Sequence, residues 1–252
     1  MDWNALQQEW DSQQMTYLPD REERFAAMLD AVEAAVGNEP RILDLAGGTG
    51  SITIRALDRF PKATSVVLDV DAALLAIAAG TFEGDERVQV LSADLANRDW
   101  RQALGDEAEF DAVLTATALH WLTPERVAGV YAEAASVLRP GGIFANADHM
   151  PDEGLAGLTG ALSALNGKRQ EQAQAVPGAT DWDGWWVRLR TEPALADAVA
   201  ARDARFADRG GSEHTESTMS SAWHVAALRE AGFVEAGLVW RGHTDAAVVG
   251  VR

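Results

Sequence analysis

Short hydrophobic runs alternate with longer amphipathic stretches through the first part of the chain, as far as Asp148. Unbroken apolar runs of strand length are typical of β-strands that are buried on both faces of a sheet. These runs predict strands at 41–46, 64–69, 87–92, 110–115 and 142–147. Two later runs, 232–240 and 245–252, flank the turn sequence Arg-Gly-His-Thr and predict a closing antiparallel hairpin.

The stretches between the predicted strands carry helical periodicity. Before the first strand, hydrophobic side chains repeat at i, i+3, i+4 and i+7 from Phe25 to Val32, and Asp20 with Glu23 makes a capping-box pair ahead of them. Another helix is expected at 222–231, ahead of the hairpin. This alternation predicts an α/β fold: a Rossmann-like, doubly wound and mostly parallel seven-stranded sheet with an antiparallel C-terminal hairpin.

The strand pattern stops after residue 150. Residues 151–222 contain helical stretches and no convincing strand, which predicts a helical insertion between the fifth and sixth strands. We therefore divide the chain into an N-terminal helical segment (1–36), a Rossmann-like ligand-binding core (37–150), the helical insertion (151–222), and the last helix with the closing hairpin (223–252).

Composition narrows the possible functions. The chain has 252 residues, a formal net charge of −18 and no cysteine. An acidic chain is repelled by nucleic acid and by anionic membranes, so neither is an expected partner. No apolar run approaches the ~18 residues of a membrane span, and Met1 to Trp10 lacks the pattern of a signal peptide, so the expected location is the cytoplasm. Without cysteine, and without zinc-like spacing among the five histidines, no metal site is expected.

A cluster of small residues follows the first predicted strand and reads DLAGGTG from Asp44 to Gly50. In a parallel sheet the carboxyl ends of the strands form the ligand crevice, and glycine lets the backbone approach a ligand closely. This position therefore indicates a nucleotide-like ligand. A phosphate-binding loop ends in Gly-Lys-Ser/Thr, but here Ser51 follows Gly50 directly, and the dinucleotide fingerprint requires a glycine where this chain has Thr53. Binding of NAD is therefore the minority interpretation.

The DLAGGTG segment resembles the first motif of the class I S-adenosylmethionine-dependent methyltransferases, acidic-x-Gly-x-Gly-x-Gly, with Ala46 in place of the first glycine. Three further segments resemble the family in the expected order: VVLDVD ends the second strand, SADL ends the third, and FDAVLTATALHWL forms the fourth, followed by VLRPGGIFANADH. The resemblance covers about residues 42–149 and the final hairpin. It implies S-adenosyl-L-methionine as the cofactor and S-adenosyl-L-homocysteine as the product.

The resemblance also implies which residues bind the cofactor: Tyr17, Arg21, Asp44, Ala46, Gly48, Asp69, Val70, Asp94, Leu95 and Thr115. Asp69 would accept hydrogen bonds from both ribose hydroxyls, and Asp94 one from the adenine amino group. Arg21 would lie near the carboxylate of the cofactor. The alternatives are an N-cap role for Asp69, a turn cap for Asp94 and a solvated side chain for Arg21.

A small-molecule methyl acceptor, modified at oxygen, nitrogen or carbon, is expected from the same resemblance. His120 is the first candidate for a general base and His149 the second, because each follows a strand end near the expected methyl group; a packing role for His120 is the alternative. In small-molecule members of the family the insertion often forms a lid. Trp182, Trp185 and Trp186 in it predict an aromatic wall for an apolar or aromatic acceptor, or alternatively a satellite hydrophobic core.

Two other interpretations stay open beside the leading hypothesis of a small-molecule methyltransferase. A catalytically silent binding module would keep Asp69 and Asp94 but have no acceptor pocket. An NAD-dependent oxidoreductase is disfavoured by Asp44 and Thr53. The expected assembly is a monomer or a homodimer.

Overall fold

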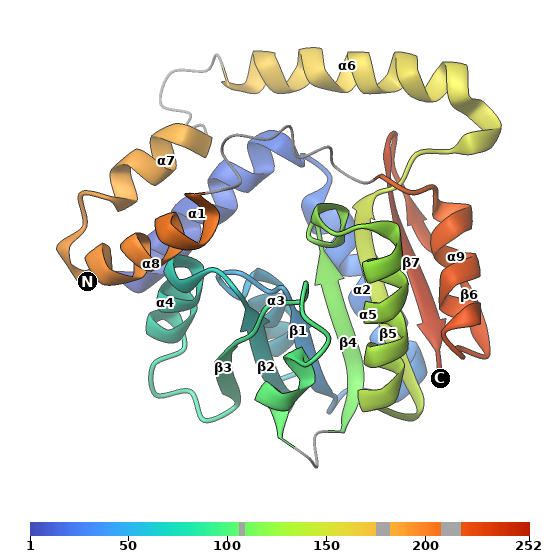
Figure 1. Cartoon of the computed structure of the whole chain (residues 1–252), viewed down its shortest axis with the longest axis horizontal. Coiled ribbons are helices and arrows are strands. Elements are labelled where there is room, and N and C mark those ends of the chain that lie inside the picture. Colours follow the sequence, from blue (N-terminus) through green and yellow to red (C-terminus); the bar gives the residue numbers. More distant parts are fainter. Residues whose placement is uncertain (106–108, 175–181, 208–217) are drawn as a thin grey trace.

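The computed structural model describes residues 1–105, 109–174, 182–207 and 218–252. Its centre is a seven-stranded sheet in the order β3-β2-β1-β4-β5-β7-β6 (Figure 1). The strands are β1 (Arg41–Leu45), β2 (Thr64–Asp69), β3 (Val88–Ser92), β4 (Phe110–Ala116), β5 (Leu138–His149), β6 (Glu235–Arg241) and β7 (Asp245–Val251). Neighbouring strands from β3 to β5 are parallel, whereas β7 is antiparallel to both β5 and β6. The predicted fold class is confirmed, closing hairpin included.

Helices cover both faces of this sheet (Figure 1). They are α1 (Trp3–Tyr17), α2 (Arg21–Val36), α3 (Ser51–Arg59), α4 (Ala72–Thr81), α5 (Pro124–Val137), α6 (Ala156–Gln174), α7 (Trp182–Leu189), α8 (Ala196–Phe206) and α9 (Ser221–Glu230). On one face, Met28 of α2 and Ile52 of α3 are buried with residues of β1 and β4. On the other face, Val130 of α5 and Leu228 of α9 belong to the second large core cluster. Burial of these apolar faces drives the helices onto the sheet.

The fifth strand is longer than the sequence predicted. β5 begins at Leu138, which pairs with Phe110, and it continues to His149. Gly141 has a φ of 77°, a left-handed conformation that glycine adopts freely, and the strand accommodates it near its start. At the other end, the extension carries Asp148 and His149 to the carboxyl edge of the sheet.

The order of the strands reverses between β1 and β4. Such a switch point opens a crevice at the carboxyl ends of the strands, because the connections leave the two strands toward opposite faces. β1 ends at Leu45 and β4 ends at Ala116, so the DLAGGTG loop and the loop that carries His120 both border this crevice.

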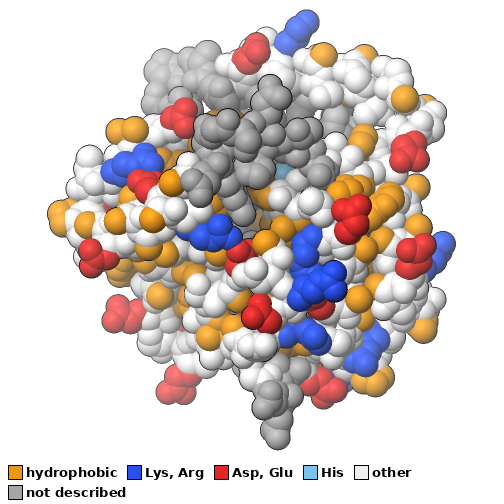
Figure 2. Space-filling model, in the orientation of Figure 1, with side chains coloured by type: hydrophobic (Ala, Val, Ile, Leu, Met, Phe, Trp, Pro, Cys, Tyr) orange, Lys and Arg blue, Asp and Glu red, His pale blue; other side chains and the backbone are white. Residues whose placement is uncertain are grey.

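The insertion after β5 is helical in its described residues, as the sequence predicted. Helix α6 stretches across the top of the molecule in Figure 1, and Figure 2 shows hydrophobic side chains along that upper edge. Leu158 of α6 is 54% exposed. The insertion's role as a lid and the division of the chain into segments remain predictions. None of the described helices is long and apolar enough to cross a membrane.

Candidate active site

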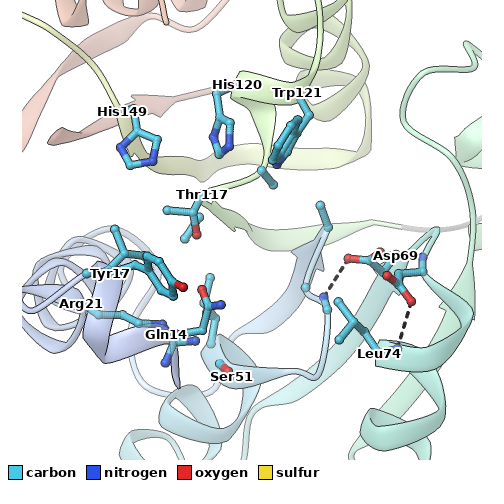
Figure 3. Close-up of a pocket in the computed structure, with 18 of the residues that line it drawn as sticks. Gln14, Tyr17, Arg21, Ser51, Asp69, Leu74, Thr117, His120, Trp121 and His149 are labelled. Atoms are coloured by element: carbon cyan, nitrogen blue, oxygen red, sulfur yellow. Dashed lines mark hydrogen bonds between the residues drawn. The ribbon is translucent and has the colours of Figure 1, made fainter. Parts of the chain in front are cut away.

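A cavity of about 1080 Å³ lies at the switch point of the sheet. The loops after β1, β2, β3 and β4 line it, together with side chains of α1, α6 and α8. In Figure 3, Tyr17 at the end of α1 and Arg21 at the start of α2 lie on one side of this space, Asp69 on another, and His120 with His149 along a third. Ligand pockets for one small molecule span roughly 300–1,000 Å³, so this cavity has room for a nucleoside-sized ligand and a second small molecule.

The loop after β1 brings its backbone close to the cavity. A Cβ added to Gly47 would lie 2.6 Å from Cγ of Asp44, so only glycine fits there. Ala46 and Gly48 have φ values of 55° and 56°, in the left-handed region. Glycine adopts this conformation freely, whereas alanine does so at a cost. Both residues line the cavity, as Asp44 does.

Asp44 ties this loop to the first turn of α3. Its Oδ2 accepts hydrogen bonds from the backbone N–H of Thr53 at 3.1 Å and from the Thr53 hydroxyl at 2.8 Å. Burial raises the pKa of Asp44 to about 6, against the effect of these two hydrogen bonds, which favour the carboxylate. Thr53, which stands where the dinucleotide fingerprint has a glycine, therefore holds the Asp44 carboxylate in place.

Asp69 ends β2 and faces the glycine loop. Its carboxylate accepts hydrogen bonds from the backbone N–H groups of Gly48 at 2.8 Å, Val70 at 2.7 Å and Asp71 at 2.8 Å. Burial raises the pKa of Asp69 to about 6, although these hydrogen bonds lower it. The residue that caps α4 is Asp71, so the N-cap alternative for Asp69 is wrong. Asp69 and Val70 both line the cavity.

Asp94 follows β3 and is engaged by the insertion. It forms an ion pair with Arg205 of α8 and accepts a hydrogen bond from the backbone N–H of Ala96 at 2.9 Å. Arg202 of the same helix pairs with Asp71 at 2.8 Å. Helix α8 therefore bridges two strand ends that border this side of the cavity. Leu95, also in the lining, is buried next to Asp94.

The opposite wall comes from Tyr17, the last residue of α1, and from Arg21, the first residue of α2. Arg21 is only 5% exposed, so the solvated alternative for it is wrong. Its Nη1 lies 2.6 Å from Oδ1 of Asp11, and the same carboxylate oxygen accepts a hydrogen bond from the Ser51 hydroxyl at 2.7 Å. The hydroxyl of Tyr17 accepts a hydrogen bond from the backbone N–H of Trp182 at 3.0 Å, which links α1 to the insertion.

Thr115 does not line the cavity, contrary to the sequence prediction. Its side chain is fully buried within β4, and among the described residues its hydroxyl has no hydrogen-bond partner. Successive side chains on a strand point to opposite faces, and the strand ends one residue later. The lining is formed instead by the residues that follow, Ala116, Thr117 and Ala118. Thr117 has a φ of 50°, which is rare for a β-branched residue.

His120 and Asp148 form a buried pair at the edge of the cavity. His120 lies in the short 3-10 helix Leu119–Trp121, and its Nδ1 is 2.7 Å from Oδ1 of Asp148. Burial by itself raises the pKa of Asp148, but the hydrogen bond and charge of His120 outweigh it, so the pKa lies below its ordinary value. An ionised carboxylate only accepts hydrogen bonds, so Nδ1 carries the proton and Nε2 of neutral His120 keeps its lone pair.

His149 makes an equivalent contact with a different carboxylate. Its Nδ1 lies 2.5 Å from Oδ1 of Asp245, and Oδ2 of Asp245 accepts a hydrogen bond from Arg24 at 3.0 Å. The rings of His120 and His149 are 5.0 Å apart at their centroids. Burial alone raises the pKa of Asp245, but His149 and Arg24 lower it below its ordinary value. Both predicted histidines therefore line the cavity with carboxylate partners that the sequence had not assigned.

The three tryptophans of the insertion separate into two environments. Trp185 and Trp186 are 0% and 3% exposed and pack with Leu6 and Trp10 of α1 in a satellite core. They do not line the cavity, so the structure favours the satellite-core alternative for these two residues. Trp182 is 40% exposed and does line the cavity. Trp182 is the first residue of α7, one turn before the buried pair, and its ring still contacts Trp186 at a centroid distance of 5.7 Å.

The structure also brings together side chains of the kinds that bind metals. His120, Asp148 and His149 offer ligand atoms that all lie within 4.8 Å of one another. Asp148 Oδ1 already accepts hydrogen bonds from the His120 ring and from the backbone N–H of His149 at 2.8 Å. Hydrogen bonding among the three residues therefore accounts for their proximity, and the absence of a resident metal remains a prediction.

Several cavity residues were not predicted from the sequence: Gln14, Ser51, Thr117, Trp121, Arg202 and Phe206. The positive φ of Thr117 leaves no mark in the residue types. Asp148 stands beside His149 in the chain, but its contact with His120 depends on where the loop after β4 folds back.

Residues 42–142 match a sequence family described as "Methyltransferase domain". A ubiquinone/menaquinone biosynthesis C-methyltransferase from Dinoroseobacter shibae is 34% identical over 124 residues, which cover 46% of this chain and 45% of that protein. A trans-aconitate 2-methyltransferase from Deinococcus radiodurans is 31% identical over 148 residues, 54% of this chain and 52% of that protein. The chain thus spans about half the length of these two relatives.

The fold is also found in solved structures. Human N-acetylserotonin methyltransferase in complex with S-adenosylmethionine superposes with a TM-score of 0.55, at 15% sequence identity, over 97% of this chain and 56% of that chain. At this level of identity the likeness concerns the fold alone.

Proposed function

Because the chain belongs to the class I S-adenosylmethionine-dependent methyltransferases, whose cofactor is S-adenosyl-L-methionine, we propose that it transfers a methyl group from this cofactor to a small-molecule acceptor. The released product is S-adenosyl-L-homocysteine. One observation carries the proposal: the cavity at the switch point of the sheet, in which the glycine loop and the carboxylate of Asp69 meet at 2.8 Å. Bound there, the cofactor supplies an electrophilic methyl group with a neutral leaving group.

The residues of the cavity fit this cofactor. Ala46 and Gly48 turn the loop so that backbone rather than side chain faces the space in which the methionyl part would lie. Oδ2 of Asp69 accepts a single backbone hydrogen bond, and its remaining lone pair would accept a ribose hydroxyl. Val70 and Leu95 would flank the adenine, whose amino group would meet Asp94.

The wall formed by the end of α1 and the start of α2 suits the charged end of the cofactor. Arg21 is buried, lines the cavity and keeps a positive charge, while Tyr17 places a hydroxyl nearby. A guanidinium that is held by Asp11 on one nitrogen still has donors on the others, and these match the geometry of a carboxylate. We assign the methionyl carboxylate to this wall.

His120 is the general base in this proposal. With its Nδ1 proton held by Asp148, its Nε2 can accept the proton that the acceptor loses on methylation. The imidazolium that results is stabilised by the buried carboxylate of Asp148. His149 is the second candidate, since Asp245 holds it in the same way.

The acceptor that fits is small and has an apolar or aromatic body. Trp121, Leu122 and Trp182 line the cavity and offer apolar area, and Trp121 lies 5.0 Å from His120 between ring centroids. Helix α6 adds polar side chains at helical spacing, Thr159, Ser163 and Asn166. An aromatic body that carries polar substituents matches both kinds of wall.

Calorimetry with S-adenosyl-L-homocysteine and with NAD tests the cofactor, and mass spectrometry of S-adenosyl-L-methionine incubated with a panel of small phenols and hydroxy acids tests the transfer. We expect binding of the first ligand, none of NAD, and formation of a product 14 mass units heavier (CH₂). Binding of NAD alone would favour the oxidoreductase. Binding without transfer to any acceptor would favour the silent module.

A further inference from the structure

We propose that Thr117 is a specificity-determining residue whose hydroxyl donates a hydrogen bond to the oxygen of a phenol-like methyl acceptor. This inference rests on the proposed methyltransferase function and goes beyond it, because it names the acceptor atom and a residue that selects it.

Thr117 occupies a backbone conformation that costs free energy. Its φ of 50° crowds Cβ against the backbone, and a second heavy branch at Cβ makes the crowding worse. The amide of Thr117 donates to the carbonyl oxygen of Ala147 at 2.9 Å, which holds the turn after β4 in this shape. Among the described residues only Ala46 shares a positive φ without being glycine, and both residues line the cavity. Strain of this kind concentrates at functional sites.

The turn alone does not account for a threonine at this position, because glycine would form it without strain. What threonine adds is its side chain. Figure 3 shows that side chain projecting into the cavity, with His120 and His149 on one side and Gln14 with Tyr17 on the other. A hydroxyl there can donate to a ligand atom that lies between these two groups of side chains.

A methyl acceptor with a hydroxyl group complements the hydrogen-bonding groups of Thr117 and His120. It carries one proton, which His120 Nε2 accepts, and two lone pairs, one of which accepts the Thr117 hydrogen bond. The second lone pair forms the new O–CH₃ bond while the carbon–sulfur bond breaks and leaves its electron pair on sulfur. The positive charge thereby moves from the sulfonium to the imidazolium beside Asp148. An ammonium group has no lone pair to accept from Thr117, so this arrangement selects oxygen over a protonated amine.

The aromatic body follows from the walls around this point. Trp121 stands next to His120 in the chain and lines the cavity, and Tyr17 faces Thr117 across it. Aromatic rings of this kind pack well against another ring. A phenol therefore places its oxygen between Thr117 and His120 while its ring contacts Trp121.

Thr117→Val is the informative substitution, since it keeps the shape and the β-branch of the residue but removes the hydroxyl. The matched control is Thr115→Val, the same change two residues earlier on β4, where the hydroxyl is buried, has no partner among the described residues and lies outside the cavity. Thr117→Ser retains the hydroxyl, and Thr117→Gly releases the strain.

The probes are 4-nitrophenol and nitrobenzene, which differ by the hydroxyl, titrated by calorimetry into the complex with S-adenosyl-L-homocysteine. We expect the wild type to prefer 4-nitrophenol, and Thr117→Val to weaken 4-nitrophenol binding about 3- to 10-fold, the effect of one lost hydrogen bond. Nitrobenzene binding should be unchanged. Thr117→Ser and Thr115→Val should bind like the wild type. Thr117→Gly should bind 4-nitrophenol weakly yet melt about 2–4 °C higher.

Three results would overturn the proposal. Equal binding of both probes to the wild type, or binding of neither, would remove the phenol-like acceptor. Unchanged 4-nitrophenol affinity in Thr117→Val would remove the hydrogen bond. A loss of S-adenosyl-L-homocysteine affinity in Thr117→Val would assign the hydroxyl to the cofactor instead. Failure of the wild type to bind S-adenosyl-L-homocysteine would contradict the proposed function itself. This first titration therefore distinguishes a failure of the proposed function from a failure of the Thr117 proposal.

Discussion

Nδ1 of His120 lies 2.7 Å from Oδ1 of Asp148, a residue 28 positions away in the chain, and both side chains are buried at the edge of the cavity. The backbone N–H of His120 also donates to Oδ2 of the same carboxylate, at 3.2 Å. Asp148 therefore fixes both the position of the loop and the tautomer of the ring. A histidine that served only to fill space would not need its proton placed in this way.

His120→Ala should lower turnover of a phenolic acceptor by about 10²–10⁴-fold, the usual contribution of a general base, while leaving S-adenosyl-L-homocysteine affinity within twofold. Asp148→Asn should also lower turnover, because an amide can donate to Nδ1 and stabilise the wrong tautomer. The control is His243→Ala, since His243 is exposed and does not line this cavity. The measurement is S-adenosyl-L-homocysteine formation per folded molecule. Equal turnover in all three variants would leave His120 with a packing role.

Cofactor affinity should depend on pH through Asp69. Burial raises its pKa to about 6, so in the free protein the carboxyl gains a proton as the pH falls through this value. The ionised form keeps a free lone pair for the ribose, and we expect S-adenosyl-L-homocysteine to bind about 10-fold more weakly at pH 5 than at pH 8. Asp69→Asn should bind weakly at both pH values. A flat pH profile in the wild type would contradict the ribose contact.

The same raised pKa values affect folding stability in the opposite direction, because they favour the folded state at low pH, where cofactor binding is weaker. Asp44 and Asp69 titrate near 6 in the folded chain but near their ordinary value of 3.8 when unfolded. Between these pH values the folded state holds more protons, so this contribution to stability is present at low pH and is lost as the pH rises through 6. Melting curves of the ligand-free protein at pH 5 and pH 7 measure this contribution to stability, and Asp69→Asn is the control.

Ala46→Gly should stabilise the protein. The φ of 55° at Ala46 costs about 1–2 kcal/mol relative to glycine, and the extra freedom of glycine in the unfolded chain returns about 0.4–1 kcal/mol of that. We expect a net gain of about 0.5–1 kcal/mol in urea unfolding. The same substitution at Ala56, inside α3 and fully buried, should destabilise instead. A less stable Ala46→Gly protein would mean that the methyl group makes a contact worth more than the strain.

Trp185→Ala and Trp182→Ala should have different effects although the residues are one helical turn apart. Trp185 is fully buried in the satellite core, so its removal should cost about 3–5 kcal/mol of unfolding free energy. Trp182 is 40% exposed and lines the cavity, so its removal should reduce acceptor turnover and cost less stability than Trp185→Ala, although its ring also contacts Trp10 and Trp186. A large stability loss in Trp182→Ala, with turnover per folded molecule intact, would place both rings in the core.

The sheet was predictable because its residues repeat a simple pattern. Runs such as 64–69 are buried on both faces, and the structure assigns that strand the same bounds. The glycine loop and Asp69 were found because they follow strands directly, and strand ends in a parallel sheet share one edge. Asp148 and Asp245 were not found, since each meets its histidine through tertiary folding that leaves no periodic trace.

The tryptophan cluster shows a second limit of prediction from the sequence. Residue type told us that Trp185 and Trp186 would be buried, but burial against α1 and burial against an acceptor look the same in a sequence. Thr117 presents the opposite problem, because an ordinary residue type conceals an unusual φ. Local chemistry predicts what a side chain can do, whereas its direction depends on the backbone around it.

Helix α1 and helices α7 and α8 share one hydrophobic cluster, with Leu6 and Trp10 at one end of the chain and Trp186 and Val199 near the other. During synthesis the apolar face of α1 emerges first, and it cannot be completed until almost two hundred residues have followed. Contacts of such long sequence separation form late in folding, after the contacts among the parallel strands β1 to β5, which lie between these helices in the chain. The wall of the cavity that α1 and α8 form is therefore expected to assemble late in folding, and a chain truncated before α8 would lack both that wall and the hairpin that completes the sheet.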